Sequence, residues 1–138
     1  MRKIEHLGIA VVDLKKSNEL FQRLLGNAPY KSEKVVTEGV ETSFFQVGDT
    51  KIELLQASSP DSPIAKFIEK KSEGIHHIAF DVEDIFAEMS RLKAEGFEIL
   101  NEVPKKGADN KIVVFLHPKS TNGVLVELCQ TDPNSTNR

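Results

Sequence analysis

The chain has 138 residues, of which 39% are hydrophobic and 28% charged, and its formal net charge is −3. These values are typical of one globular domain and argue against broad electrostatic attraction to nucleic acid or to an anionic membrane. The single cysteine, Cys129, excludes an intrachain disulfide and fits a reducing cytoplasm. The N-terminal apolar run is too short for a signal peptide, and no run approaches the length of a membrane span.

The first half of the chain predicts the order β-α-β-β-β. Its predicted strands are 4–12, 33–38, 41–47 and 51–56. Asp13 is expected to cap a helix over residues 17–25, which Gly26 ends in a left-handed turn. The buried stripe of this helix is expected to consist of Leu20, Phe21, Leu24 and Leu25.

A loop over residues 57–63 and a short helix that starts at Ser62 and Pro63 are expected to link two halves of one domain. The second half then predicts the same order of elements. Its predicted strands are 75–82, 97–103, 112–116 and 124–129. Asp84 is expected to cap a helix with the apolar stripe Ile85, Phe86, Met89 and Leu92. The predicted organisation is one domain over 1–131, made of module one (1–57), a linker helix (58–73) and module two (74–131), with a flexible tail over 132–138.

The two halves also share sequence. Residues 6–10 (HLGIA) align with residues 77–81 (HIAFD) at an offset of 71 (77 − 6). Residues 51–56 (KIELLQ) resemble residues 125–130 (LVELCQ) at an offset of 74 (127 − 53). Repetition of this kind indicates two copies of one structural unit.

Each copy contributes one histidine and one glutamate at equivalent positions: His6 and Glu53 in the first, His77 and Glu127 in the second. Alternation along a strand puts these side chains on the face opposite the large apolar residues. A glutamate among apolar residues is unusual, because charged groups avoid burial unless they are paired or bind a metal. If the copies pack about a pseudo-twofold axis, two imidazoles and two carboxylates converge on a divalent-metal site that suits Co, Mn, Ni, Zn or Fe rather than Ca.

Other candidate residues have simpler interpretations. Taken alone, His6 would more often be a hydrogen-bonded structural histidine than a ligand. His76 points away from His77 by strand alternation and is expected to pack under a helix, and His117, before a proline at a turn, is expected to be structural. Cys129 is interpreted as a small hydrophobic residue rather than a nucleophile.

Several stretches resemble a known family. They are residues 5–10 (EHLGIA), 47–55 (VGDTKIELL), 61–68 (DSPIAKFI), 74–80 (GIHHIAF), 115–120 (FLHPKS) and 123–128 (GVLVEL). Together with the two βαβββ modules, they resemble the vicinal oxygen chelate superfamily, and within it the methylmalonyl-CoA epimerases most closely. The resemblance implies an α+β fold in which two modules related by a pseudo-twofold axis form a cupped mixed sheet with the helices outside.

By this resemblance His6, Glu53, His77 and Glu127 would bind a divalent metal, and the protein would be a cytoplasmic homodimer that interconverts (R)- and (S)-methylmalonyl-CoA. Glu127 and Glu53 are the expected catalytic bases. Three lysines are candidates for the CoA phosphates or are solvated surface residues: Lys105, Lys106 and Lys119. Several epimerases carry a catalytic glutamate where this chain has Thr42, and Glu41 should face away from that position.

Two alternatives remain from the sequence. A glyoxalase I would use a similar ligand set to isomerise a glutathione hemithioacetal, and a resistance-type protein would bind a small molecule without a metal. A dioxygenase fits less well, because its site would generally show two histidines and one glutamate.

Overall fold

The chain divides into two units in the computed structural model, which describes residues 1–134. The N-terminal unit comprises His6–His76, and the C-terminal unit comprises Met1–Glu5 together with His77–Arg138. The last four residues of the tail predicted over 132–138 lie outside the described residues.

The N-terminal unit has the predicted β-α-β-β-β order followed by a helix. Its elements are β1 (Lys3–Ala10, whose first three residues belong to the other unit), α1 (Leu14–Leu25), β2 (Lys31–Val35), the 3-10 turn η1 (Val36–Glu38), β3 (Val40–Val47), β4 (Thr50–Ala57) and α2 (Pro63–Lys71). The strands lie in the order β2-β3-β4-β1. Strand β1 runs parallel to β4, whereas the other neighbours are antiparallel.

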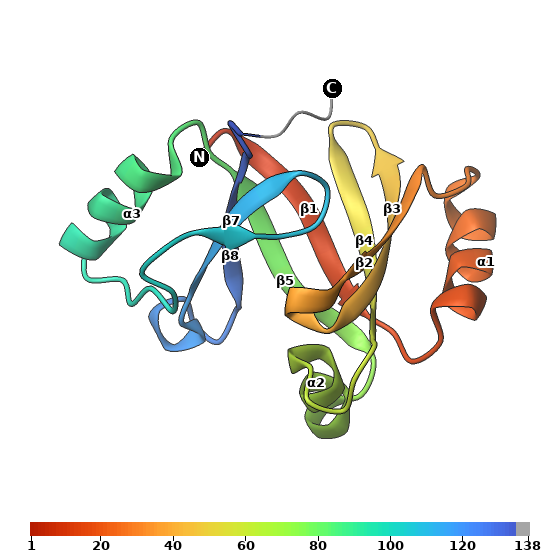
Figure 1. The fold of residues 1–138 in the computed structure, drawn as a ribbon. Helices are drawn as coiled ribbons and strands as arrows, with labels where there is room; N and C mark the ends of the chain where they lie inside the picture. The colour runs from red at the N-terminus through yellow and green to blue at the C-terminus, as the bar shows by residue number, and fades with distance from the viewer. Residues whose placement is uncertain (135–138) are drawn as a thin grey trace. The chain divides into compact units, whose positions relative to one another are not determined.

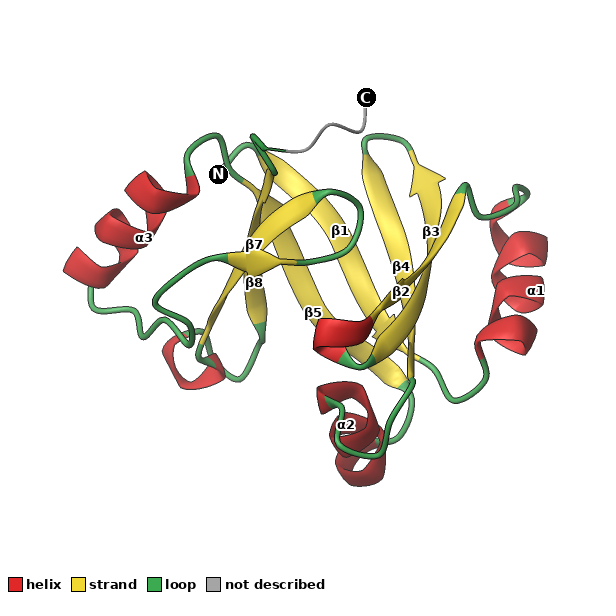
Figure 2. Cartoon of the chain, in the orientation of Figure 1, coloured by secondary structure: helices red, strands yellow, loops and turns green. Residues whose placement is uncertain are grey.

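The C-terminal unit repeats this plan. Its elements are β5 (Gly74–Asp81, which begins in the other unit), α3 (Ile85–Ala94), β6 (Lys105–Lys106), β7 (Lys111–Leu116), the 3-10 turn η2 (Pro118–Ser120) and β8 (Val126–Thr131). The strands lie in the order β6-β7-β8-β5, with β5 parallel to β8. Figures 1 and 2 show these elements, and the predicted α+β class with two βαβββ modules is confirmed.

The N-termini of α1 and α3 are fixed by equivalent residues. Asp13 and Asp84 each accept backbone N–H groups of their own first helical turn, as predicted for N-caps. A glutamine from the last strand of each unit then accepts the first helical N–H. Gln56 Oε1 lies 2.7 Å from the nitrogen of residue 14, and Gln130 Oε1 lies 2.7 Å from the nitrogen of residue 85. The internal repeat therefore extends to how each helix is attached to its sheet.

Each unit buries apolar side chains between its helix and one face of its sheet. Around α1 the buried cluster is Val11, Leu14, Phe45 and Leu54, and around α3 it includes Val82, Ile85, Met89, Val114 and Leu128. The predicted helical stripes were too wide, because Leu20, Leu24 and Phe86 are more than half exposed. Phe21 and Leu25 do pack against the first cluster, as predicted.

The strand predicted over 97–103 is wrong. The segment is irregular, with one isolated bridge between Ile99 and Leu116, and the short strand β6 follows it at Lys105 and Lys106. The side chain of Asn101 takes the place of a backbone ladder here. Its Oδ1 accepts from the backbone N–H of residue 115 at 3.0 Å, and its Nδ2 donates to the carbonyl of residue 113 at 3.3 Å. These side-chain bonds occupy backbone groups of β7 that strand pairing would otherwise use.

Two predicted strand boundaries also shift. The strand expected over 33–38 ends at Val35, because Val36–Glu38 forms η1 and Gly39 adopts a positive φ of 64°. The strand expected over 124–129 begins at Val126 and ends at Thr131. No helix among residues 1–134 has both the length and the apolar character of a membrane-crossing segment.

We expect Gln130→Met to lower the free energy of unfolding by about 1–2 kcal/mol, because the part-buried backbone N–H of Ile85 would lose its acceptor. Denaturant unfolding of the variant and of Gln22→Met measures this difference. Gln22 is an exposed residue of α1, so its replacement should change stability by less than about 0.5 kcal/mol. Equal stability of both variants and the wild type would contradict the assigned role of Gln130.

Candidate metal centre

The N-terminal unit contains a buried histidine–glutamate pair. Strand β1 places His6, Gly8 and Ala10 on the face opposite α1, and the parallel register sets Gly8 beside Glu53 of β4. Gly8 is buried and has no side chain to stand beside Glu53, and His6 Nε2 lies 3.2 Å from Glu53 Oε1. We call this side of each unit, away from its helix, the site face.

The C-terminal unit contains the equivalent pair. Strand β5 places His77 and Ala79 on the site face, and the register sets Ala79 beside Glu127 of β8. His77 Nε2 lies 3.4 Å from Glu127 Oε1. A small residue thus stands beside the glutamate in both units.

The two pairs have the burial and spacing expected of metal ligands. Their four side chains are only 4–8% exposed. A direct charge-assisted hydrogen bond would bring nitrogen and oxygen to about 2.7–2.9 Å. Two atoms that each lie about 2.1 Å from one cation are instead about 3.0 Å apart at right angles and about 3.4 Å apart in a tetrahedron. The observed 3.2 and 3.4 Å are compatible with two ligands of one ion and equally with a long hydrogen bond between imidazole and carboxylate.

An aromatic ring packs against each histidine in the same way. The ring centroids of His6 and Phe44 are 6.3 Å apart with an interplanar angle of 85°, and those of His77 and Phe115 have the same values. Phe44 also stands directly opposite Glu53 in its sheet, as Phe115 does opposite Glu127. Each unit therefore holds a histidine, a glutamate and a phenylalanine in one arrangement, and the ring limits how the imidazole can turn.

The other two histidines are structural, as the sequence predicted. His76 packs edge-on against Phe67 of α2, with ring centroids 5.0 Å apart. His117 Nδ1 accepts the backbone N–H of Lys119 at 3.0 Å and so caps η2.

The three candidate substrate lysines have different surroundings. Lys105 Nζ lies 5.6 Å from the centroid of the Phe115 ring, which places this ammonium on the site face of the C-terminal unit. Lys106 is the next residue of β6 and is exposed. Lys119 Nζ forms a 2.8 Å ion pair with Glu98 at the surface.

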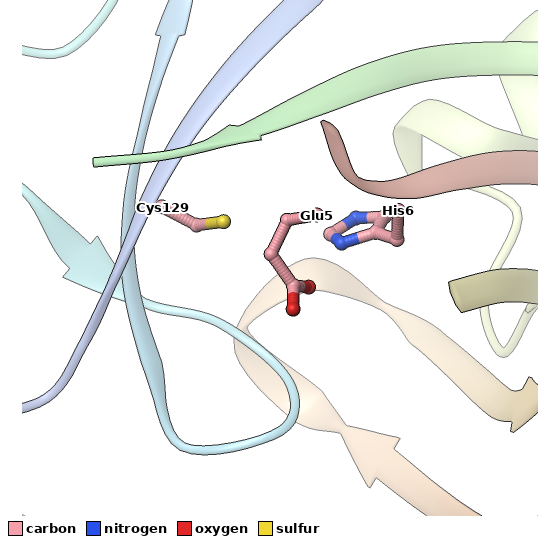
Figure 3. Close-up of side chains that lie close together, drawn as sticks. All are labelled: Glu5, His6 and Cys129. Carbon is pink, nitrogen blue, oxygen red and sulfur yellow. The ribbon is translucent and has the colours of Figure 1, made fainter. Parts of the chain in front are cut away.

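Sequence reasoning missed Glu5, whose side chain is buried near the only cysteine. One carboxylate oxygen of Glu5 lies within 4.8 Å of Cys129 Sγ, and Figure 3 shows the thiol pointing toward the Glu5 side chain. Burial first, and then the charges of Glu127 and Glu5, raise the pKa of the Cys129 thiol far above its usual range. The thiol therefore stays protonated, and its weak 3.5 Å contact with the carbonyl of Phe80 fits the predicted role of a small packing residue.

Thr42 is fully buried on the site face of the N-terminal unit, and its hydroxyl oxygen has no hydrogen-bond partner among the described residues. It stands two residues from Phe44 on β3, so both point to the same face. Glu41 lies on the opposite side, where it lines a surface cavity with Leu14 and Asn18 of α1. The prediction that Glu41 faces away from the site is confirmed.

We expect Thr42→Val to raise the free energy of unfolding by about 1 kcal/mol, because it removes an unpaired buried hydroxyl and keeps the shape of the side chain. Ser43→Ala is the matched control. Ser43 is equally buried but donates its hydroxyl to Asn18, so its loss should lower stability by about 1 kcal/mol. Denaturant unfolding of both variants tests this, and two changes of the same sign would contradict it.

Comparisons with known proteins agree with this geometry. The family described as the Glyoxalase/Bleomycin resistance protein/Dioxygenase superfamily matches residues 5–115. The Ethylmalonyl-CoA/methylmalonyl-CoA epimerase of Cereibacter sphaeroides is 44% identical over 130 residues, covering 93% of this chain and 97% of that protein. The uncharacterized protein YqjC of Bacillus subtilis is 38% identical over 130 residues, covering 94% of this chain and 93% of its own.

The fold is shared with solved epimerase structures. A variant of the Streptomyces coelicolor methylmalonyl-CoA epimerase in complex with 2-nitronate-propionyl-CoA superposes with a TM-score of 0.90 at 31% identity. The match covers 95% of this chain and 98% of that one. The chain therefore belongs to the glyoxalase/bleomycin resistance protein/dioxygenase superfamily, also called the vicinal oxygen chelate superfamily, and is closely related to the methylmalonyl-CoA epimerases.

Proposed function

We propose that this protein is a metal-dependent epimerase that interconverts (R)- and (S)-methylmalonyl-CoA. Two observations support the proposal. Each unit buries a histidine beside a glutamate in the same arrangement. The chain is also 44% identical to a bacterial ethylmalonyl-CoA/methylmalonyl-CoA epimerase. The cytoplasmic location and the homodimer expected from the sequence stay predictions.

We propose His6, Glu53, His77 and Glu127 as the ligands of one divalent cation. The chemistry of this donor set fits Co, Mn, Ni, Zn or Fe, because imidazole and carboxylate together suit these ions. The spacing within each pair fits two ligands of one ion. When bound, the cation would act as a Lewis acid for the negative charge that develops on the substrate oxygens.

The reaction requires removal of the proton at C2, which lies between a thioester and a carboxylate. Glu127 is the proposed residue for one of the two proton transfers. Glu127 is buried on the site face beside His77, and a carboxyl group placed there can take a proton from carbon and return it. The sequence predicts Glu53 for the second transfer.

The remaining side chains would hold and enclose the acyl group. Phe44 and Phe115 flank the histidines and keep water away from the reacting carbon. Lys105, which lies over Phe115, and the surface residues Lys106 and Lys119 are proposed contacts for the phosphates of CoA.

The direct test incubates the protein with each divalent metal and (R)- or (S)-methylmalonyl-CoA in deuterated water. We expect deuterium at C2 and loss of optical purity from either enantiomer, both abolished by chelator and restored by metal. Turnover of a glutathione hemithioacetal instead would identify a glyoxalase I. Absence of exchange with every metal would contradict the epimerase and favour a binding protein.

The same assay examines the ligands. His77→Ala and Glu127→Gln should each lower kcat/KM by at least about 100-fold, because one removes a ligand and the other a ligand and a base. His117→Gln is the matched control, because this histidine only caps η2, and its activity should stay within about threefold of the wild type.

A further inference from the structure

Inversion at C2 needs two proton-transfer groups, one on each face of the planar carbon. This requirement rests on the proposed epimerase function. If Glu127 and Glu53 both served as bases, both carboxylates would share their electron pairs with protons while negative charge develops on the substrate. The cation would then be held mainly by two imidazoles when its charge matters most. A second base outside the ligand set avoids this conflict.

We propose that Glu33 is the second acid–base residue. In the antiparallel pairing of β2 and β3, Glu33 stands directly opposite Thr42. Its neighbour Ser32 lines the cavity on the α1 side together with Glu41, so alternation directs Glu33 to the site face. Thr42 and Phe44 share that face, and Phe44 packs against His6.

The spacing suits a substrate between Glu33 and the metal ligands. Glu33 lies two strands away from Glu53 and two residues further along, which puts their Cα atoms about 12 Å apart. Both side chains rise from the same face, so a planar acyl group fits between them. The Glu33 side chain is 30% exposed, whereas Glu53 is almost fully buried, so Glu33 is accessible to a bound ligand.

Two polar groups lie beside the Glu33 carboxylate. Lys31 Nζ is 3.5 Å from its Oε1. The unpaired hydroxyl of Thr42, directly across the strand pair, is a donor that can orient the carboxylate when the side chain turns toward a substrate. Binding would thus give this buried hydroxyl the partner it lacks.

Glu41, on the neighbouring strand, does not fit this role. Glu41 faces α1. In the C-terminal unit the equivalent register position, opposite Val113, is held by Lys105. The second copy therefore offers a cation where the first offers an acid–base group.

The proton balance is simple. In one direction Glu33 takes the C2 proton while the C–H electron pair moves into the thioester carbonyl, and Glu127 as its acid form donates a proton to the other face. In the reverse direction the roles exchange. After a turnover one carboxyl group is protonated and the other ionised, and exchange with water restores the starting pair.

The test compares metal-loaded wild type and Glu33→Gln, with each enantiomer of methylmalonyl-CoA, in deuterated water. We expect epimerisation to fall by at least about 100-fold in the variant. One enantiomer presents its C2 proton to Glu127, which the variant retains. For that enantiomer the rate of deuterium exchange at C2 should stay within about tenfold of the wild-type rate, and its configuration should be retained. Metal content should be unchanged.

Two controls separate chemistry from structure. Glu41→Gln removes a carboxylate from the neighbouring strand on the opposite face, and Lys31→Met removes the ion pair but keeps Glu33. Both should keep the wild-type ratio of inversion to exchange. The inference is overturned if Glu33→Gln keeps that ratio for both enantiomers, or if either control loses inversion equally. Failure of the wild type to exchange any proton would instead overturn the proposed function itself.

Discussion

A carboxylate buried beside an imidazole nitrogen is the arrangement on which this structure depends. Removing a carboxylate from water costs about several kcal/mol, even after the protein has relaxed around it. An interior glutamate therefore needs a positive partner. The chain creates this situation twice, at Glu53 and at Glu127, and in both cases a histidine nitrogen lies 3.2 or 3.4 Å from the carboxylate. A cation held by all four side chains would neutralise both carboxylates at once. The two glutamates would destabilise the fold without a cation, and the same energetic cost would favour binding of a metal.

Duplication explains how so short a chain builds such a site. The two units share strand order, helix caps, the glutamine that anchors each helix, and the phenylalanine beside each histidine. The two units differ at two positions near the proposed substrate, which is itself asymmetric. Thr42 corresponds to Val113, and Glu33 to Lys105, by their positions in the two sheets. The repeated positions are those proposed to bind the cation, and the divergent positions are those proposed to distinguish the two faces of the substrate.

Much of this was predictable because strands alternate strictly. Because side chains alternate along a strand, the sequence placed four residues on the faces opposite the helices: His6, Glu53, His77 and Glu127. The internal repeat also predicted which histidine lies with which glutamate in each unit. Helical stripes are less sharply defined, so Leu20 and Phe86 were wrongly expected to be buried.

Glu33 and Glu5 were missed for another reason. Each owes its surroundings to a residue of another strand, Thr42 for the first and Cys129 for the second, and strand register does not follow from composition. Asn101 shows the same limit, because its side chain replaces backbone pairing in a segment that otherwise has the pattern of a strand.

The stoichiometry of metal binding tests the central claim most directly. Elemental analysis of protein dialysed against limiting divalent metal should give one ion per chain. His6→Ala and His77→Ala should each lose that ion almost completely, although each leaves the histidine–glutamate pair of the other unit intact. Two ions per chain, or one ion retained by either variant, would show that the pairs act separately and would contradict a shared centre.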